Sequence, residues 1–298
     1  MKNLQEKTHT HIPVMTGEAL KYLNLNPDGI YIDGTIGGGG HAKMILSMLS
    51  SKGKLIGIDR DPEALALCRE RFNSTDQISL HHNSYHNTDK IMEELGIQKV
   101  NGILLDLGLS SLQLNSKRRG FSFKNDGRID MRFDNSSGTT AEDFIKGLTE
   151  KELANIIFEF GEERRSRKIS KAIKEAPELS TTSDIKEAIR KSTPPHHRNK
   201  TLARVFQALR IAVNDEIDKL VQFLKEFMNY LDFEGRLVII SYHSIEDRLV
   251  KKTFRKLKDE KKVHLLTKKP LTPLTIELNQ NNRSRSAKLR ALESIAQV

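Results

Sequence analysis

Residues 29–41 read Gly-Ile-Tyr-Ile-Asp-Gly-Thr-Ile-Gly-Gly-Gly-Gly-His and carry the strongest structural signal in the chain. The apolar run 29–33 ends in an acid, as expected for a short buried strand. Glycines follow at once, and a helix is expected over 41–50. A strand, a glycine-rich loop and a helix in this order are typical of the first unit of a doubly wound sheet, whose loop holds a ligand at the helix N-terminus.

The same alternation extends outward from this unit. Further strands are expected where apolar runs recur, at 54–59, 78–81, 100–106 and 235–241. Helices are expected between the first of these runs, at 62–72 and 88–95, and a long amphipathic helix is expected at 202–230. Apolar strands separated by helices predict an α/β fold with a parallel sheet covered on both faces.

The alternation stops between the fourth and fifth expected strands. Residues 107–133 resemble a loop, and several short helices are expected after them; Thr149 and Glu152 form a capping-box pattern at the start of one. We therefore expect a discontinuous sheet domain, 1–133 and 200–298, and a helical insertion at 134–199. The segment after Lys268 has no clear assignment from its pattern.

Composition excludes several classes of protein. With 298 residues, of which 37% are hydrophobic and 30% charged, the chain can bury a core and is neither wholly disordered nor fibrous. It has no apolar run long enough for a membrane-spanning helix, and Met1–His11 lacks the apolar segment of a secretory signal. The single cysteine, Cys68, excludes an internal disulfide and fits a reducing cytosol. Because of this cysteine count, we expect a cytoplasmic protein. The adjacent histidine pairs lack the spacing of metal ligands, so we expect no metal site.

The positive charge is concentrated in one part of the chain. The net charge is +10, and residues 248–290 contain 14 basic and 3 acidic side chains. Such a segment attracts phosphates and makes affinity depend on salt. Charge alone favours a nucleic-acid partner no more than it favours an ordinary solvated surface.

Three acids end expected strands at the same edge of the sheet: Asp33, Asp59 and Asp106. A carboxylate beside the glycines would repel a pyrophosphate but attract the ammonium and sulfonium of S-adenosylmethionine, and Asp59 lies where a ribose is usually bound. The glycines, including Gly37, also fit a dinucleotide fingerprint, so an NAD-dependent oxidoreductase is an alternative. A noncatalytic RNA-binding protein is a third interpretation.

Several longer motifs, in order along nearly the whole chain, resemble one family, the bacterial 16S rRNA cytosine-N4 methyltransferases of the MraW type. The matching segments are 33–41, 106–113, 119–132, 161–164, 203–211, 241–248 and 282–290. The resemblance implies a class I S-adenosylmethionine-dependent methyltransferase sheet with an inserted helical domain that recognises the substrate. It also implies methyl transfer to the exocyclic N4 of a cytidine in the small ribosomal subunit, near the decoding centre.

The resemblance assigns roles to individual residues. The family's donor-binding positions match Gly39, Gly40, His41, Asp59, Tyr85, Asp106 and Gln113; Asp33 and Gly37 join them from the loop argument above. Asp106 is expected to accept a hydrogen bond from N4–H or from the ammonium of the donor, and the sequence leaves both open. Ser110, Ser111 and His243 are candidates for the pocket of the target base.

RNA contacts are expected from two basic groups. Arg118, Arg119 and Lys124 flank Phe121 and Phe123, whose rings either stack on bases or pack inside the protein. The second group lies near the C-terminus and contains Arg283, Arg285, Lys288 and Arg290. A DNA or protein acceptor is the alternative within methyltransferases, and the choice between a monomer and a homodimer stays open.

Overall fold

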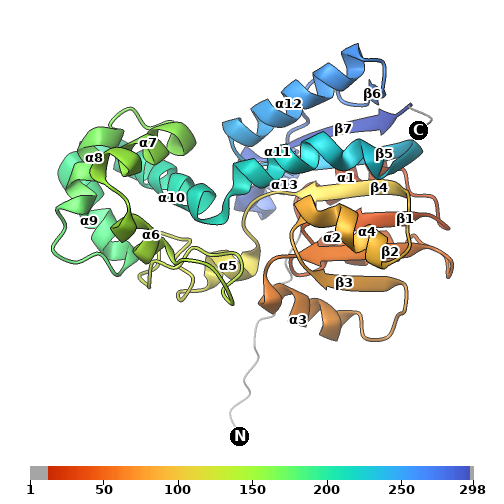
Figure 1. The fold of residues 1–298 in the computed structure, drawn as a ribbon, viewed down its shortest axis with the longest axis horizontal. Helices are drawn as coiled ribbons and strands as arrows, with labels where there is room; N and C mark the ends of the chain where they lie inside the picture. The colour runs from red at the N-terminus through yellow and green to blue at the C-terminus, as the bar shows by residue number, and fades with distance from the viewer. Residues whose placement is uncertain (1–12, 296–298) are drawn as a thin grey trace, which may run out of the picture.

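A seven-stranded sheet forms one half of the molecule (Figure 1). The computed structural model describes residues 13–295, so the polar stretch Met1–His11 lies outside the described residues. The strand order is β3-β2-β1-β4-β5-β7-β6, with β1 to β5 parallel and β7 antiparallel to both its neighbours. The strands are β1 (Ile30–Asp33), β2 (Lys54–Asp59), β3 (Ile78–His82), β4 (Val100–Asp106), β5 (Leu231–Ser241), β6 (Val263–Leu265) and β7 (Lys288–Ser294).

Helices cover both faces of the sheet, because successive side chains of each strand point to opposite faces. On β1, Ile32 packs into one core and Tyr31 into the other. The first core is closed by α4 (Thr88–Glu94), α11 (Glu216–Glu226) and α12 (Ser244–Asp259). The second is closed by α1 (Thr16–Leu23), α2 (Gly40–Leu46) and α3 (Pro62–Arg71). The expected α/β class is confirmed.

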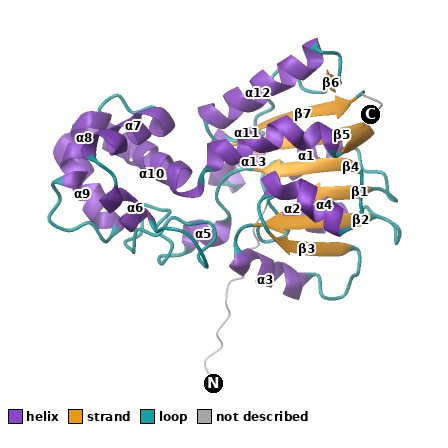
Figure 2. Ribbon diagram, in the orientation of Figure 1, coloured by secondary structure: helices purple, strands orange, loops and turns teal. Residues whose placement is uncertain are grey.

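A separate group of helices stands beside the sheet, at the left of Figure 2. It contains α6 (Ala141–Gly147), α7 (Glu150–Gly161), α8 (Ser166–Lys174), α9 (Thr182–Ser192) and α10 (Arg198–Asn214), and it has its own apolar core. That core also includes Phe121, Met131 and Val205, which lie outside the expected limits of 134 and 199. The side chains of Thr149 and Glu152 cap α7 as the motif predicted.

Shorter elements complete the described chain. The α-helices are α5 (Ser111–Asn115) and α13 (Thr275–Gln280). The 3-10 helices are η1 (Tyr85–Asn87), η2 (Pro195–His197), η3 (Phe227–Asn229) and η4 (Asn282–Ser286). Within residues 13–295, no helix has the length and apolarity needed to cross a bilayer.

The five expected strands are confirmed, but the single helix over 202–230 is wrong. The chain breaks between α10 and α11 at Asp215, which has a left-handed backbone with φ 51°. Asn214 holds the junction through its amide, which donates to the Met131 carbonyl at 2.7 Å and accepts from the Phe133 N–H at 2.7 Å. Arg210 pairs with Glu216 across the break at 2.7 Å. Both helices bury one apolar face, so periodicity alone showed no interruption.

Candidate active site

The glycine-rich loop lies between β1 and α2, at the carboxyl edge of the sheet. Gly37 and Gly39 have positive φ angles of 50° and 76°. Two side chains of helix α3 hold the loop through hydrogen bonds to its carbonyls. The Cys68 thiol donates to the Gly37 carbonyl at 3.2 Å, and the Arg71 guanidinium donates to the Gly38 carbonyl. The loop is therefore shaped before any ligand arrives, with α2 beginning directly behind it.

Replacing Gly39 by alanine should lower the free energy of unfolding by about 1–3 kcal/mol, because alanine is strained at this φ. A Cβ at this position would lie 2.7 Å from the Phe72 ring. Urea denaturation measures the loss, and affinity for the methyl donor should fall with it. Gly38→Ala is the matched control, because a Cβ there has no atom within 4 Å in the described structure. Equal stability of the two variants would contradict the prediction.

The three acids expected at the edge of the sheet do lie there, since each ends its strand beside a parallel neighbour. Asp33 is 1% exposed; one oxygen accepts from the Thr35 N–H, and the other, Oδ2, has no hydrogen-bond partner among the described residues. Burial raises the pKa of Asp33 to about 7. A buried carboxylate oxygen without a partner fits a cationic ligand, and it would oppose a pyrophosphate.

Asp59 has both oxygens engaged by the backbone. They accept from the Gly37 N–H at 2.7 Å and from the Asp61 N–H at 2.8 Å. Burial raises the pKa of Asp59 to about 6, although these two hydrogen bonds oppose the shift. Asp59 thus joins the glycine loop to the start of α3, and carboxylates keep further lone pairs for ribose hydroxyls.

Asp106 is held between two other side chains at the end of β4. The Tyr242 hydroxyl donates to its Oδ1 at 2.7 Å, and Nδ1 of His41 lies 3.9 Å from its Oδ2. Nε2 of His41 lies 3.0 Å from the Val14 carbonyl, which can only accept, so that nitrogen carries a hydrogen. Burial raises the pKa of Asp106. The carboxylate is therefore held in a fixed orientation at the carboxyl edge of β4.

Tyr242, which the sequence analysis did not single out, contacts Asp106, whereas the neighbouring His243 contacts Glu246. The His243 ring caps α12, accepting from the Glu246 N–H at 3.3 Å and lying 3.0 Å from the Glu246 carboxylate. Among the described contacts it does not touch Asp106, and its expected place in the base pocket stays a prediction. The signal for Tyr242 was its position directly after a strand, where side chains reach the edge of the sheet.

Tyr85 and the serines lie around the same edge. The Tyr85 ring packs edge-on against Phe223, with centroids 5.6 Å apart, and its Cβ lies close to Gly34 at the start of the loop. Ser110 caps α5, accepting from the Gln113 N–H at 3.3 Å, and Ser111 accepts from Arg283. Tyr85 and Ser110 therefore lie beside the glycine-rich loop.

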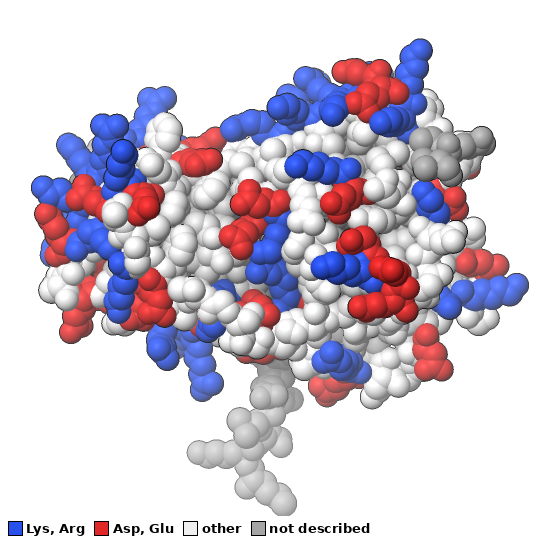
Figure 3. All heavy atoms as spheres, in the orientation of Figure 1, with Lys and Arg blue, Asp and Glu red and all other residues white. Residues whose placement is uncertain are grey.

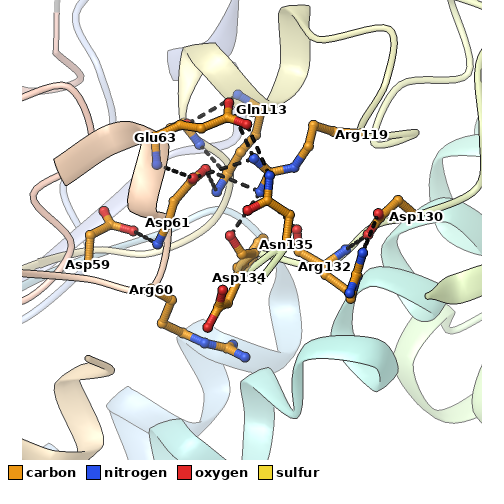
Figure 4. Close-up of polar contacts among 12 residues, drawn as sticks. Asp59, Arg60, Asp61, Glu63, Gln113, Arg119, Asp130, Arg132, Asp134 and Asn135 are labelled. Atoms are coloured by element: carbon orange, nitrogen blue, oxygen red, sulfur yellow. Dashed lines mark hydrogen bonds and ion pairs between the residues drawn. The ribbon is translucent and has the colours of Figure 1, made fainter. Parts of the chain in front are cut away.

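A buried polar network links the carboxyl edge of the sheet to the loops of the helical unit (Figure 4). Asp61, at 0% exposure, accepts from the Gln113 side-chain amide at 3.0 Å and lies 3.2 Å from the Arg119 guanidinium. Arg119 also donates to the carbonyls of Arg132 and Phe133, at 2.9 and 2.8 Å. Gln113 was expected to bind the donor, but its amide is used internally by Asp61 and by the Ser110 N–H.

The residues that were expected to contact RNA differ in their exposure to solvent. Arg118, Lys124 and Arg285 are exposed, and Arg283 and Lys288 are partly so. Arg119 is 4% exposed and Arg290 7%. The expectation that these two bind RNA is wrong: each neutralises a buried or partly buried acid, Arg119 on Asp61 and Arg290 on Asp247 at 2.7 Å.

The two phenylalanines of the same loop pack inside the protein. The Phe121 ring lies 5.7 Å from Phe133, and the Phe123 ring lies 5.5 Å from Phe206 on α10. Packing, the second of the two interpretations, is the one the structure supports for both rings.

One cluster has the residue types of a metal site. Glu216, His243 and Glu246 bring possible ligand atoms within 4.8 Å of one another. Arg210, however, forms a two-pronged ion pair with Glu216 at 2.7 and 2.9 Å, and His243 pairs with Glu246. Arg210 therefore balances the charge of Glu216, and the Glu246 carboxylate is engaged by the His243 ring and by the Tyr242 N–H at 2.9 Å.

The sheet order, with antiparallel β7 between β5 and β6, and the acidic edge beside a glycine-rich loop define a class I methyltransferase fold. A family model described as the MraW methylase family matches residues 8–295. The chain belongs to this family. The match confirms the predicted resemblance and favours the methyltransferase interpretation over the dinucleotide one.

Curated relatives agree with the family match. A protein of Kosmotoga olearia named Ribosomal RNA small subunit methyltransferase H is 44% identical over 98% of this chain and 99% of its own length. Proteins of the same name from Thermotoga neapolitana and Caldicellulosiruptor saccharolyticus are 44% and 42% identical, over 98% and 96% of this chain and 98% and 100% of their own lengths.

Proposed function

We propose that this protein is a cytoplasmic enzyme that methylates the exocyclic N4 of a cytidine in 16S rRNA of the small ribosomal subunit, near the decoding centre. The methyl donor is S-adenosylmethionine, which supplies a methyl group on a sulfonium. The observation that carries the proposal is Asp106, a half-buried carboxylate held by Tyr242 at the same edge as Asp33 and Asp59. The names of the relatives support small-subunit rRNA as the acceptor.

The donor site is built from the loop and the acids. Gly39 shapes the turn, its N–H donating to the Ile36 carbonyl at 2.8 Å, and the N–H groups of Gly40 and His41 at the start of α2 bind the ligand. The free oxygen of Asp33 balances positive charge. Asp59 accepts from ribose hydroxyls, and Tyr85 provides an apolar plane for the adenine. Gln113 contributes indirectly, through Asp61, which donates its N–H to Asp59.

Asp106 acts on the acceptor. The N4 lone pair of cytidine is conjugated with the ring, so the amino group is a poor nucleophile. A carboxylate that accepts a hydrogen bond from N4–H increases electron density on the nitrogen and fixes its direction of attack. Tyr242 keeps the other oxygen of Asp106 occupied, which orients the carboxylate. Ser110 and Ser111 border the base.

The partner is rRNA within the folded subunit. Arg118, Lys124 and Arg285 are exposed for phosphate contacts, with Arg283 and Lys288 nearby. The reaction needs no metal, and the helical insertion 134–199 provides part of the recognition surface. A homodimer is the assembly to test by measuring the mass in solution.

Affinity for S-adenosylmethionine should rise about tenfold or more between pH 5.5 and 8. The raised pKa values of Asp33, about 7, and Asp59, about 6, mean that both carboxyls are partly protonated at the acidic end. Binding a cation requires the ionised form, so each lost proton strengthens binding. Calorimetric titration at a series of pH values measures the effect.

The same raised pKa values act in the opposite direction on the ligand-free fold. The folded protein binds more protons than the unfolded chain between about pH 4 and 7, so these two groups contribute stability at low pH that is lost as the pH rises.

Asp33→Asn should weaken donor binding and flatten its pH profile. A donor affinity that stays constant from pH 5.5 to 8 in the wild type would contradict the assignment.

The proposed reaction is tested by transfer of radiolabelled methyl groups from S-adenosylmethionine to small ribosomal subunits that lack the modification. Naked rRNA, DNA and protein are parallel acceptors, and digestion to nucleosides identifies the product. We expect N4-methylcytidine from the subunit, at a rate unchanged by EDTA. Label in another nucleoside, or only in DNA or protein, would overturn the proposal. Binding of NAD by the protein, without binding of S-adenosylmethionine, would also overturn it.

A further inference from the structure

Helix α12 presents a basic face to solvent that none of the roles above uses. Six cations, Arg248, Lys251, Lys252, Arg255, Lys256 and Lys258, are all exposed. At 3.6 residues per turn they fall on one side of the helix, opposite the buried Val250 and Phe254. Figure 3 shows the Lys and Arg atoms gathered along the upper margin of the molecule, where Figure 1 places α12.

Most of these cations are not neutralised by the protein. Arg248 pairs with Glu162 of the helical unit at 2.6 Å, and Lys256 lies 3.7 Å from Glu260. Lys251, Lys252, Arg255 and Lys258 make no ion pair within the described part of the chain. A row of like charges repels itself, and a polyanion lying along it would relieve that repulsion.

The basic face ends in a cavity between α12 and β6. The cavity has a volume of about 360 Å³ and is lined by Arg255, Lys258, Asp259, Leu265 and Lys268. Three cations at its wall suit a phosphate group. The single carboxylate, Asp259, suits the 2′-hydroxyl of a ribose, which RNA has and DNA lacks.

The other end of α12 lies at the proposed reaction site. The helix begins at Ser244, two residues after Tyr242, whose hydroxyl contacts Asp106. Sixteen residues of helix span roughly 24 Å. A strand whose target base enters at Asp106 therefore reaches both the basic face and the cavity.

We infer that the basic face of α12, together with the cavity at its end, binds the phosphate backbone of the rRNA next to the target nucleotide. This inference rests on the proposed function and extends it to a surface far from the methyl group. It also gives the positive charge of residues 248–290 a location: α12 carries exposed, unpaired cations, whereas Arg290 and Lys288 are paired with Asp247.

The test compares two triple variants of the full chain. The first, Lys251→Gln, Arg255→Gln and Lys258→Gln, removes one stripe of α12 that leads into the cavity. The control, Lys21→Gln, Lys52→Gln and Lys54→Gln, removes three exposed lysines near the amino ends of β1 and β2, away from the acidic edge. Glutamine matches lysine and arginine in helix propensity, so α12 should stay folded, which circular dichroism checks.

The measurement is the dissociation constant for small ribosomal subunits lacking the modification, over 50–200 mM KCl, with vesicles of anionic phospholipid as a second probe. The α12 variant should bind subunits about 10- to 100-fold more weakly and reduce the salt slope by about 2 to 3, while affinity for S-adenosylmethionine is unchanged. The control should match the wild type.

The outcomes separate this surface from the reaction. Wild-type methylation of subunits together with equal binding by both triple variants would overturn the inference and leave the proposed function standing. Weaker subunit binding by the α12 variant, with no N4-methylcytidine formed by the wild type, would support the surface and overturn the function. Loss of vesicle binding alone would assign the basic face to a lipid surface and overturn the RNA assignment.

Discussion

Asp106→Ala should lower the rate of methyl transfer about 100- to 10,000-fold, the range expected when a group that accepts a proton or hydrogen bond from the reacting atom is lost. The carboxylate is oriented by the Tyr242 hydroxyl at 2.7 Å and lies at the carboxyl edge of β4. Steady-state transfer of radiolabelled methyl groups to small ribosomal subunits, with kcat and KM for each substrate, measures the loss.

The two parameters distinguish the roles that the sequence left open for Asp106. A carboxylate that accepts from N4–H affects kcat, whereas one that accepts from the donor's ammonium affects the KM for S-adenosylmethionine. Tyr242→Phe is the partner variant: it keeps the carboxylate, removes one hydrogen bond to a charged group, and should cost about tenfold. Methylation by Asp106→Ala at the wild-type rate would exclude a direct role.

Arg119→Met should lower the free energy of unfolding by about 3–5 kcal/mol, because removing one partner leaves the other as an uncompensated buried charge. That partner is Asp61, which is fully buried. The guanidinium also satisfies the carbonyls of Arg132 and Phe133, so the substitution leaves acceptors unpaired. Urea denaturation followed by circular dichroism measures the change.

Arg118→Met is the matched control, since it removes the same charge from the exposed neighbouring position. It should change stability by less than about 0.5 kcal/mol. A double-mutant cycle with Asp61→Asn isolates the pair: most of the penalty of Arg119→Met should disappear when Asp61 is already neutral. Equal stabilities of the two single variants would show that the buried pair does not hold the loop.

The Asp61 network has a consequence for the whole molecule. Asp61 donates its N–H to Asp59, the residue proposed to hold the ribose, and its carboxylate contacts Arg119, which is bonded to the loop leading into the helical unit. Arg60 adds a second link, donating to the Asn214 carbonyl at 2.8 Å. The carboxyl edge of the sheet and the helical unit are thus joined by buried and part-buried contacts from two consecutive residues, Arg60 and Asp61.

Much of the fold was predictable from the sequence because its signals are local. The apolar runs of β1 to β5 and the glycines after Asp33 are each a property of a few consecutive residues. The Thr149 capping box is likewise read from four positions. The C-terminal strand β7 was not found, because its apolar residues, Leu289, Ala291 and Leu292, are interrupted by charged residues. Those charges pair with Asp247 on α12 and Arg236 on β5, which the sequence does not show.

The sequence by itself determined the first five strands along the chain, the glycine-rich loop and the acids at three strand ends, since these depend on neighbours along the chain. Only the tertiary structure decided which of two adjacent side chains contacts Asp106: Tyr242 does, while His243 caps a helix. It also buried Arg119 and left Arg118 in solvent. Those outcomes depend on contacts between segments far apart in sequence. Two neighbouring side chains point in different directions, so one can meet a buried partner while the other is exposed to solvent.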